Sequence, residues 1–394
     1  MRLLNKTISE INTYDSNNIE VNTTDTTAAI DTLLQDPRFD FDFWYCLFSD
    51  PKSFSLINFL DLIDQETLQL VKQHKAFIVL DNTLEPFLKS IDSIYIDLVK
   101  RLGIPSGQII FLTNMPDAKK YSTDISNDLG LPPIRIFWYT VFEQDLHLAA
   151  EHTTYRDGNR DLKPKTLELK EYPKSFLNLN RRWRTHRPLL ITLLYGKGLI
   201  DKGYISFGEC DDKDNWNHKW PELMHYFRHD TKMREVLNAY KDVKKLPPLY
   251  LDTNELHINR AESTINTNKY YENSYFSVVS ETTYFQNEWF PNARFLSEKA
   301  FKPIAMQHPF ILVSVPNSLE LFCKLGYKTF GEIIDERYDY VSDDGTRMIM
   351  IANEIERIAN LKGKDLEEFI IKAKDICKYN YKVLANKTQF LKEL

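Results

Sequence analysis

The stretch KAFIVLDNT, residues 75–83, decides the fold class. Its apolar residues follow one another without alternation and end at Asp81, which is the pattern of a strand buried on both faces, as in a parallel sheet. Apolar residues spaced three and four apart, typical of helices, flank it at 55–74 and 87–103. Similar apolar runs occur at 41–50, 107–114 and 134–143. The first part of the chain therefore predicts a β-α-β alternation.

A polar segment, residues 151–173, interrupts this alternation and holds two prolines, so we interpret it as a linker or crossing loop. The alternation then resumes, with helices expected from 188 to about 199 and from 296 to 306. Two long amphipathic segments close the chain after residue 346. Further apolar runs lie at 175–180, 202–209, 248–252, 275–282, 309–316 and 326–330.

These patterns predict an α/β fold with two Rossmann-like domains that face each other across a cleft. The expected limits are 1–165 for the first domain, 166–345 for the second and 346–394 for helices that pack on or across them. A chain of 394 residues is longer than a single hydrophobic core usually serves, which agrees with two domains.

The composition, 43% hydrophobic with a formal net charge of -6, excludes a largely disordered chain and a protein that coats nucleic acid by bulk charge. The four cysteines are far apart, so neither a disulfide framework nor a zinc site is expected. The first residues lack the apolar core of a signal peptide, and no stretch is apolar enough to cross a bilayer. We expect a soluble protein of the cytoplasm, without a membrane partner.

Polar residues end several of the predicted strands, where ligands bind in open α/β sheets. Asp81 leaves a buried strand and Glu85 follows closely, so either could act as a general base. The alternative interpretation is that such residues cap turns and helices, and the sequence leaves both open.

The turn FLNLNRRWRTHRPLL, residues 176–190, gathers four arginines and a histidine in an acidic chain. It joins a strand to a helix, whose N-terminus favours anions, and arginine grips phosphate bidentately. A phosphate site is therefore the favoured interpretation, and a salt-bridged loop or arginines stacked on Trp183 is the alternative. No Walker loop or dinucleotide fingerprint is present. The candidate ligand-binding residues are Asn180, Arg181, Arg182, Arg184, His186 and Arg187.

A second candidate group begins where the strand at 275–282 ends, at Glu281. After an aromatic loop, Ser297 is placed to cap a helix. Glu298 and Lys302 are four residues apart, which a plain surface ion pair would also explain. The candidates in this segment are Glu281, Ser297, Glu298, Lys299 and Lys302.

The second segment resembles the donor-site signature of GT-B glycosyltransferases, most of all the α1,3-fucosyltransferase type. The resemblance rests on VVSET (278–282), FLSEKAFKPIAM (295–306) and HPFILVS (308–314). The sequence has SET where that family has ENS, and a longer loop follows, so the donor stays open. Residues 301–339 also resemble uncharacterised glycosyltransferase-like proteins of large phages.

The resemblance implies a GT-B fold and a transferase that takes a sugar from a nucleotide-diphosphate donor. It implies that Glu281 approaches the donor sugar and Glu298 holds ribose hydroxyls, while Lys299 or Lys302 adds positive charge. The arginine turn would hold the diphosphate. The acceptor would be a glycan or, if the chain is viral, a hydroxymethylated DNA base, with the host cytoplasm as its location.

Fixed cations can stabilise a leaving diphosphate without a metal, so we expect no metal cofactor and treat the sugar nucleotide as a co-substrate. The D-x-D matches at 40–42 and 212–214 lie in polar stretches and are the weaker, metal-dependent alternative. Another class of function stays open as well. It is a non-catalytic protein whose arginine turn binds a phosphorylated ligand or nucleic acid.

Overall fold

The computed structural model divides by contacts into two compact units. Unit 1 comprises Met1–Val141, Asn287–Phe295 and Thr388–Leu394, and unit 2 comprises Phe142–Gln286 and Leu296–Lys387. Both units thus combine segments that are separate in the sequence, and the limits 1–165, 166–345 and 346–394 stay predictions. The structure describes residues 4, 30, 32–33, 35–47, 63–83, 90–151, 164–180, 183–207, 216–246, 249, 251, 268–285 and 294–393.

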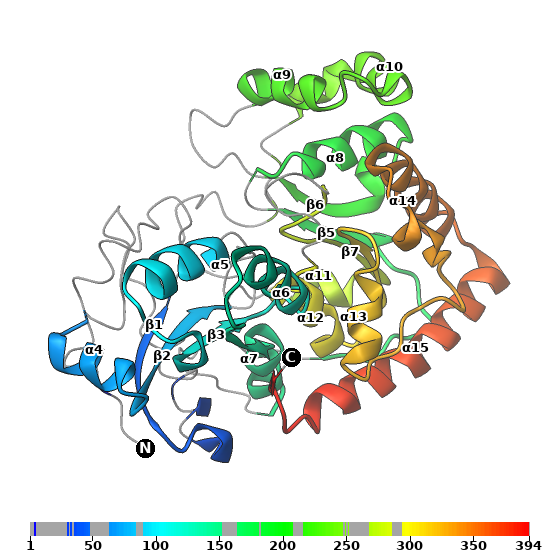
Figure 1. Ribbon diagram of the computed structural model, residues 1–394. Coiled ribbons are helices and arrows are strands. Elements are labelled where there is room, and N and C mark those ends of the chain that lie inside the picture. The colour runs from blue at the N-terminus through cyan, green and yellow to red at the C-terminus, as the bar shows by residue number, and fades with distance from the viewer. Residues whose placement is uncertain are drawn as a thin grey trace. The chain divides into compact units, whose positions relative to one another are not determined.

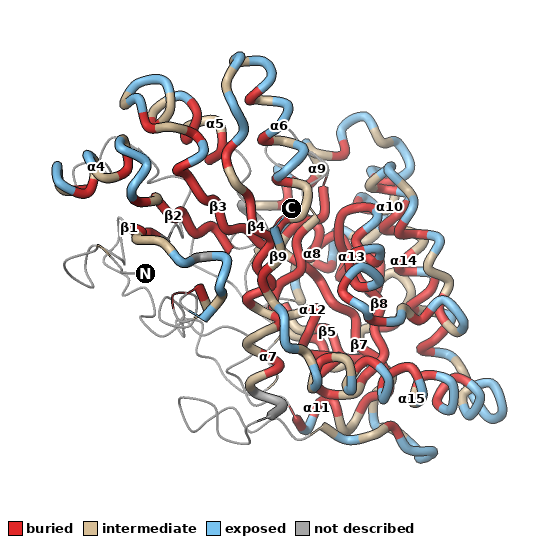
Figure 2. The backbone as a smooth tube through the Cα atoms, turned by 60° about the horizontal axis from the view of Figure 1, so that its bottom comes forward, coloured by how far each residue is buried: buried red, intermediate tan, exposed pale blue. Residues whose placement is uncertain are grey.

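Unit 1 is built on a five-stranded sheet in the order β1-β2-β3-β4-β9. The first four strands are parallel and correspond to the four apolar runs, and β2 and β3 are buried along their length (Figures 1 and 2). The predicted parallel sheet is thus confirmed. The strands are β1 (Asp42–Leu47), β2 (Ala76–Asn82), β3 (Ile109–Thr113), β4 (Arg135–Tyr139) and β9 (Leu391–Glu393).

Local signals fix the ends of the unit 1 helices. Asp64 caps its helix by accepting a hydrogen bond from the Thr67 backbone N–H at 2.8 Å. Gly130 ends another helix with a left-handed φ of 64°, which glycine adopts without strain. The helices are η1 (Pro37–Phe39), α4 (Gln65–Lys72), α5 (Ser90–Ser93), η2 (Ile94–Arg101), η3 (Ser106–Gln108) and α6 (Ala118–Leu129).

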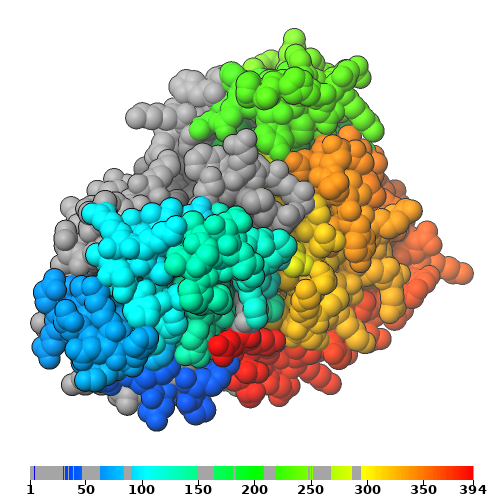
Figure 3. Space-filling view, viewed as in Figure 1, coloured from blue at the N-terminus to red at the C-terminus, as the bar shows by residue number. Residues whose placement is uncertain are grey.

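The edge strand β9 was not predicted from the sequence. It pairs antiparallel with β4, and the Thr140 N–H donates to the Phe390 carbonyl at 2.9 Å just beyond the ladder. Arg38 also donates from Nη2 to the carbonyl of Leu391 at 2.9 Å. Figure 3 shows the red residues at the end of the chain beside the blue segment near residue 38. Residues from both ends of the sequence therefore complete unit 1.

Unit 2 is built on a parallel four-stranded sheet in the order β6-β5-β7-β8. After β6 the chain returns to pair on the other side of β5, so the direction of winding reverses between β5 and β7. Such a reversal is the topological switch point where open α/β sheets bind ligands. The predicted α/β class with Rossmann-like units is confirmed. The strands are β5 (Phe176–Asn180), β6 (Gly203–Phe207), β7 (Phe276–Ser280) and β8 (Phe310–Val313).

Right-handed crossovers that run in opposite directions from the switch point place α8 and α12 on opposite faces of this sheet (Figure 1). The two C-terminal helices follow the predicted amphipathic segments, and contacts place both of them in unit 2. The helices are α7 (Val141–Glu151), α8 (His186–Gly196), η4 (Ile200–Lys202), α9 (Trp216–Tyr226), α10 (Thr231–Ala239), η5 (Lys241–Lys245), α11 (Asn268–Glu272), α12 (Glu298–Ala305), α13 (Leu319–Lys324), η7 (Glu336–Tyr340), α14 (Asp344–Ala359) and α15 (Gly363–Ala385).

One apolar run was misinterpreted: residues 326–330 form no strand. Gly326 has a φ of 96°, outside the range of a strand. The backbone of Lys328 bonds to a side chain and not to a neighbouring strand. Its N–H donates to Asn380 Oδ1 and its C=O accepts from Asn380 Nδ2, each at 2.8 Å. Of the run at 248–252, Leu249 bridges to Phe207. No described helix is long and apolar enough to span a membrane.

His308 is buried between β7 and α11 as a neutral group. Its Nε2 lies 2.9 Å from the Ser274 carbonyl and its Nδ1 lies 2.7 Å from the Ser277 hydroxyl, so Nε2 donates and Nδ1 accepts. Burial lowers the pKa of His308 to about 4, from an ordinary value of 6.5. Protonation would break the contact with Ser277 and charge a buried site.

We predict that His308 makes the fold sensitive to acid. Between pH 6.5 and pH 4 the unfolded chain binds a proton that folded His308 does not, so the unfolding free energy falls by on the order of 3 kcal/mol. Urea unfolding at about pH 7.5 and pH 5 would measure about 2 kcal/mol of this loss, because pH 5 lies about 1.5 units below the ordinary pKa of histidine. His308→Asn should be less stable at the higher pH but lose less on acidification, whereas a variant of the exposed His229, His229→Ala, should keep the full loss. An unchanged acid loss in His308→Asn would contradict the assignment.

Candidate functional site

The candidate site lies in unit 2, at the switch point between β5 and β7. β5 ends at Asn180 and leads into the turn before α8, while β7 ends at Ser280 and is followed by Glu281. The two segments singled out in the sequence therefore meet at one edge of one sheet. The resemblance implied that both segments hold the same ligand, and the structure brings them into contact, with His186 Nε2 3.0 Å from the Glu281 carbonyl.

Glu281 ties the end of β7 to the start of α12. Its Oε1 accepts from the Ser297 backbone N–H at 2.9 Å, and its Oε2 accepts from the Ser297 hydroxyl at 2.7 Å. Oε2 also accepts from the Thr282 N–H at 3.1 Å. Ser297 is the N-cap of α12, as predicted, so the carboxylate fixes where this helix begins.

Glu281 is fully buried, and its environment opposes ionisation. Burial raises the pKa of Glu281 above its ordinary value, while the nearby Lys299 ammonium and the hydrogen bonds from Ser297 act in the other direction. A contact between Glu281 and a donor sugar stays a prediction. In the structure, both of its oxygens accept hydrogen bonds from Ser297.

Glu298 and Lys299 form an ion pair at the first turn of α12, with Nζ 2.6 Å from Oε1. Burial opposes the charge on Glu298, but the Lys299 ammonium and hydrogen bonds outweigh it, so the pKa of Glu298 is lowered. The alternative interpretation, a surface ion pair between Glu298 and Lys302, is not what the structure shows: Glu298 pairs with its neighbour Lys299, and Lys302 is buried. This geometry leaves a carboxylate ionised near the switch point.

The arginine turn is partly described. Arg181 and Arg182 lie outside the described residues, and Arg184 is exposed. His186 and Arg187 are buried at the start of α8. His186 Nε2 lies 3.0 Å from the Glu281 carbonyl, and Arg187 donates to the Ser280 carbonyl at 3.4 Å. These two side chains thus bind the end of β7, and of the described arginines in the turn only Arg184 faces solvent.

A buried polar network that the sequence analysis missed supports the same edge. Arg347, 1% exposed, donates to the Tyr284 carbonyl at 2.7 Å and to Asp344 at 2.6 Å, and its guanidinium lies 4.3 Å from the centre of the Tyr284 ring. Tyr226 donates to the other oxygen of Asp344 at 2.6 Å. The His186 ring stacks on Tyr284 with centroids 5.4 Å apart.

This network holds residues 281–285 against the start of α8. Burial is the main reason that the pKa of His186 lies well below its ordinary value, with Arg187 and Arg184 acting in the same direction, so His186 is neutral. A signal was present in the sequence, because Arg347 falls at the apolar spacing of α14, next to Met348 and four residues before Ile351. A cation in that position needs buried partners.

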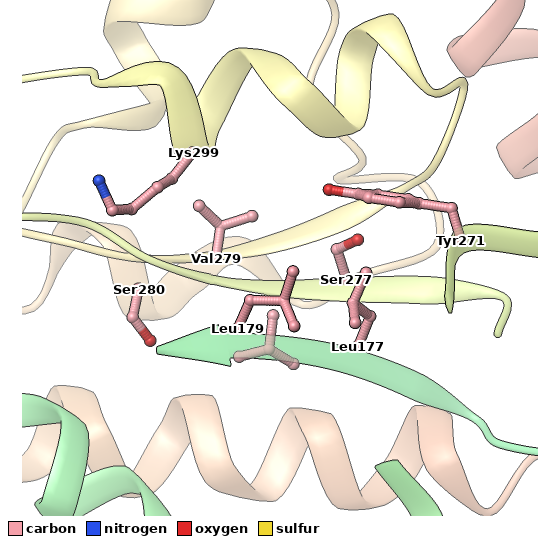
Figure 4. A pocket seen from close by; sticks show the side chains of 8 residues that line it. Leu177, Leu179, Tyr271, Ser277, Val279, Ser280 and Lys299 are labelled. Atoms are coloured by element: carbon pink, nitrogen blue, oxygen red, sulfur yellow. The ribbon is translucent and has the colours of Figure 1, made fainter. Parts of the chain in front are cut away.

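A small pocket of about 250 Å³, including the open space at its mouth, lies on the face of the sheet beneath α12. Figure 4 shows Lys299 and Tyr271 at its two ends, with the side chains of the strands between them. Lys299 is therefore both the ion-pair partner of Glu298 and a lining residue of this pocket. It is lined by Leu177, Leu179, Tyr271, Ser277, Val278, Val279, Ser280 and Lys299.

The proposed base candidates belong to unit 1, which is considered by itself. Asp81 is 1% exposed, and it accepts hydrogen bonds from the Tyr45 hydroxyl at 2.5 Å, the Thr83 N–H at 2.9 Å and the Thr83 hydroxyl at 2.7 Å. Burial raises its pKa, against those bonds. This is the capping geometry that the sequence left as the alternative, and a role as base stays a prediction. Glu85 lies outside the described residues.

The described residues hold no cluster of three or more His, Cys, Asp or Glu that could bind a metal ion. Of the two D-x-D matches, residues 212–214 lie outside the described residues, and Asp42 is the first residue of β1.

No protein-family model matches the sequence, and no curated protein matches it. Solved structures similar to the chain include α,α-trehalose-6-phosphate synthase from Burkholderia multivorans, with a TM-score of 0.43, 10% identity, and coverage of 92% of this chain and 70% of that one. Another is the UDP-forming α,α-trehalose-phosphate synthase from Burkholderia vietnamiensis, with a TM-score of 0.41, 10% identity, and coverage of 95% and 75%. Because the TM-scores lie below 0.5, the likeness carries no argument about activity.

We predict that the contact between Glu281 and Ser297 stabilises unit 2. Ser297→Ala and Glu281→Gln should each lower the unfolding free energy by about 1 to 3 kcal/mol, because each leaves a buried partner with fewer hydrogen bonds. The double variant should lose less than the sum, since both changes remove the same interaction. Urea unfolding of the four proteins measures this cycle, and strictly additive losses would show that the two side chains do not interact.

Arg347→Met should lower the unfolding free energy by about 3 to 5 kcal/mol, because it removes a buried guanidinium and leaves the half-buried Asp344 and the Tyr284 carbonyl without their partner. Arg347→Lys should lose less, since it keeps the charge but not the fork. Arg337→Ala, at an exposed arginine of the same unit, is the control and should change stability by no more than about 0.5 kcal/mol. If urea unfolding gave Arg347→Met the same unfolding free energy as Arg337→Ala, the role given to the network would be refuted.

Proposed function

We propose that the chain is a glycosyltransferase of the GT-B type that moves a sugar from a nucleotide-diphosphate donor to an acceptor hydroxyl. The observation that carries the proposal is the position of the two sequence segments. The arginine turn and the Glu281–Lys299 segment meet at the switch point of a parallel sheet, where α/β folds bind nucleotides. Two helix N-termini, of α8 and α12, start there.

In this proposal the donor diphosphate lies against Arg184, which is exposed, and against Arg181 and Arg182, the two arginines that precede it in the sequence. His186 and Arg187 position the end of β7, as their bonds to Glu281 and Ser280 indicate. Glu298, ionised beside Lys299, is placed to accept from ribose hydroxyls.

Departure of the nucleoside diphosphate leaves negative charge on its terminal phosphate. Fixed cations and a helix N-terminus stabilise that charge without reorganisation, so the reaction is proposed to need no metal. The acceptor hydroxyl loses its proton to a carboxylate, for which Asp81 and Glu85 are the candidates from the sequence.

The test of donor binding is calorimetric titration with UDP, GDP, ADP and CDP. At least one should bind, and the double variant Arg181→Ala/Arg184→Ala should bind it about 10- to 100-fold more weakly, because charge-assisted hydrogen bonds to phosphate are lost. Arg337→Ala, which removes an exposed arginine paired with Asp335, is the matched control and should bind normally. Absence of binding by all four nucleotides would refute the proposal.

Catalysis and acceptor are tested together by mass spectrometry. The nucleotide that binds is supplied as its sugar esters, with a glycan panel in one arm and hydroxymethylcytosine DNA in the other. Transfer in either arm identifies the acceptor, and transfer should persist in EDTA. Tight nucleotide binding with no transfer in either arm would favour the non-catalytic, phosphate-binding alternative.

A further inference from the structure

We propose that the side-chain carbonyl of Asn180 accepts a hydrogen bond from a hydroxyl group of the ligand, on the ribose or on the transferred sugar. The inference rests on the proposed function and adds the chemical group of the ligand that Asn180 recognises. Asn180 is the last residue of β5, at the switch point, and it directly precedes the arginine turn.

The orientation of the Asn180 amide follows from a relay of hydrogen bonds. Asn178 donates from Nδ2 to the backbone carbonyl of Val278 at 2.8 Å, and a carbonyl oxygen can only accept. The other atom of that amide is therefore Oδ1, and it accepts from Asn180 Nδ2 at 2.6 Å. If both amides were turned over, the Asn178 oxygen would face the Val278 oxygen. The remaining atom of Asn180 is thus Oδ1, an acceptor.

This acceptor has no hydrogen-bond partner among the described residues, although Asn180 is 1% exposed. A buried polar atom without a partner is uncommon in folded proteins and costs stability. Nδ2 binds Asn178, two residues back along the strand, so Oδ1 lies on the branch of the amide that does not face Asn178. The orphaned acceptor therefore belongs to the last residue of β5, at the switch point.

The polarity of this acceptor selects the group that faces it. Phosphate oxygens at neutral pH are acceptors and would repel a carbonyl oxygen, so the diphosphate does not lie against Asn180. A hydroxyl donates, and both the ribose and the transferred sugar carry hydroxyls. In this proposal the arginines of the turn bind the phosphate groups, and Asn180 binds the polyhydroxylated part of the ligand next to them.

The test is a cycle of two proteins and paired ligands, measured by calorimetry. Unmodified protein should bind the 2′-deoxy or 3′-deoxy form of its nucleoside diphosphate about 10-fold more weakly if a ribose hydroxyl is read. If the hydroxyl is on the transferred sugar, the deoxy forms should bind normally, and the loss should appear between the sugar nucleotide and its deoxysugar analogues. Asn180→Ala should bind each pair of ligands equally.

The matched control is Ser206→Ala, because the Ser206 hydroxyl contacts the Asn180 backbone N–H at 3.2 Å and not its amide group. It should keep the 10-fold discrimination. Discrimination that survives in Asn180→Ala, or that is absent for every hydroxyl, overturns the inference while leaving nucleotide binding intact. If no nucleotide binds, the melting temperature is measured with glucose, galactose, mannose, fucose, ribose and their phosphates. A rise in melting temperature that is present in the unmodified protein and lost in Asn180→Ala supports the inference. Absence of such a rise overturns it.

Discussion

The bond between the Glu281 carboxylate and Ser297 is the interaction on which the candidate site depends. Glu281 receives the N–H and the hydroxyl of Ser297 through its side chain, and its carbonyl meets His186. One residue therefore joins the start of α8 to the N-cap of α12. A buried carboxyl group is costly unless its oxygens are bonded, so the need to satisfy it fixes the start of α12, while the backbone carbonyl of the same residue holds His186 at the start of α8.

Much of the fold could be predicted from the sequence, because buried parallel strands leave an unbroken apolar run. KAFIVLDNT became β2, and FLNLN became β5. The same rule failed at 326–330, where a short run pairs with the Asn380 side chain of a distant helix. It also missed β9, whose residues Leu391–Glu393 carry no apolar run and form a strand only because β4 offers an edge.

For the site, the sequence showed that both segments follow predicted strands, and parallel strands deliver their carboxyl ends to one edge of a sheet; that these two strands are neighbours came from the structure. Sequence could not tell which charged residues would face solvent. Arg184 and Arg187 are both arginines of the same turn, yet Arg184 is exposed, whereas Arg187 is buried and donates to the Ser280 carbonyl. The partners of Arg347 come from segments far apart in the chain, so no local pattern shows them, although its position on the apolar face of α14 was a visible warning.

The strand β9 has a consequence for synthesis. Its residues are made after nearly all the others, yet they pair with β4 of unit 1, whose other strands are made first. The sheet of unit 1 therefore carries an open edge while unit 2 is being translated, and open edges invite pairing with other chains.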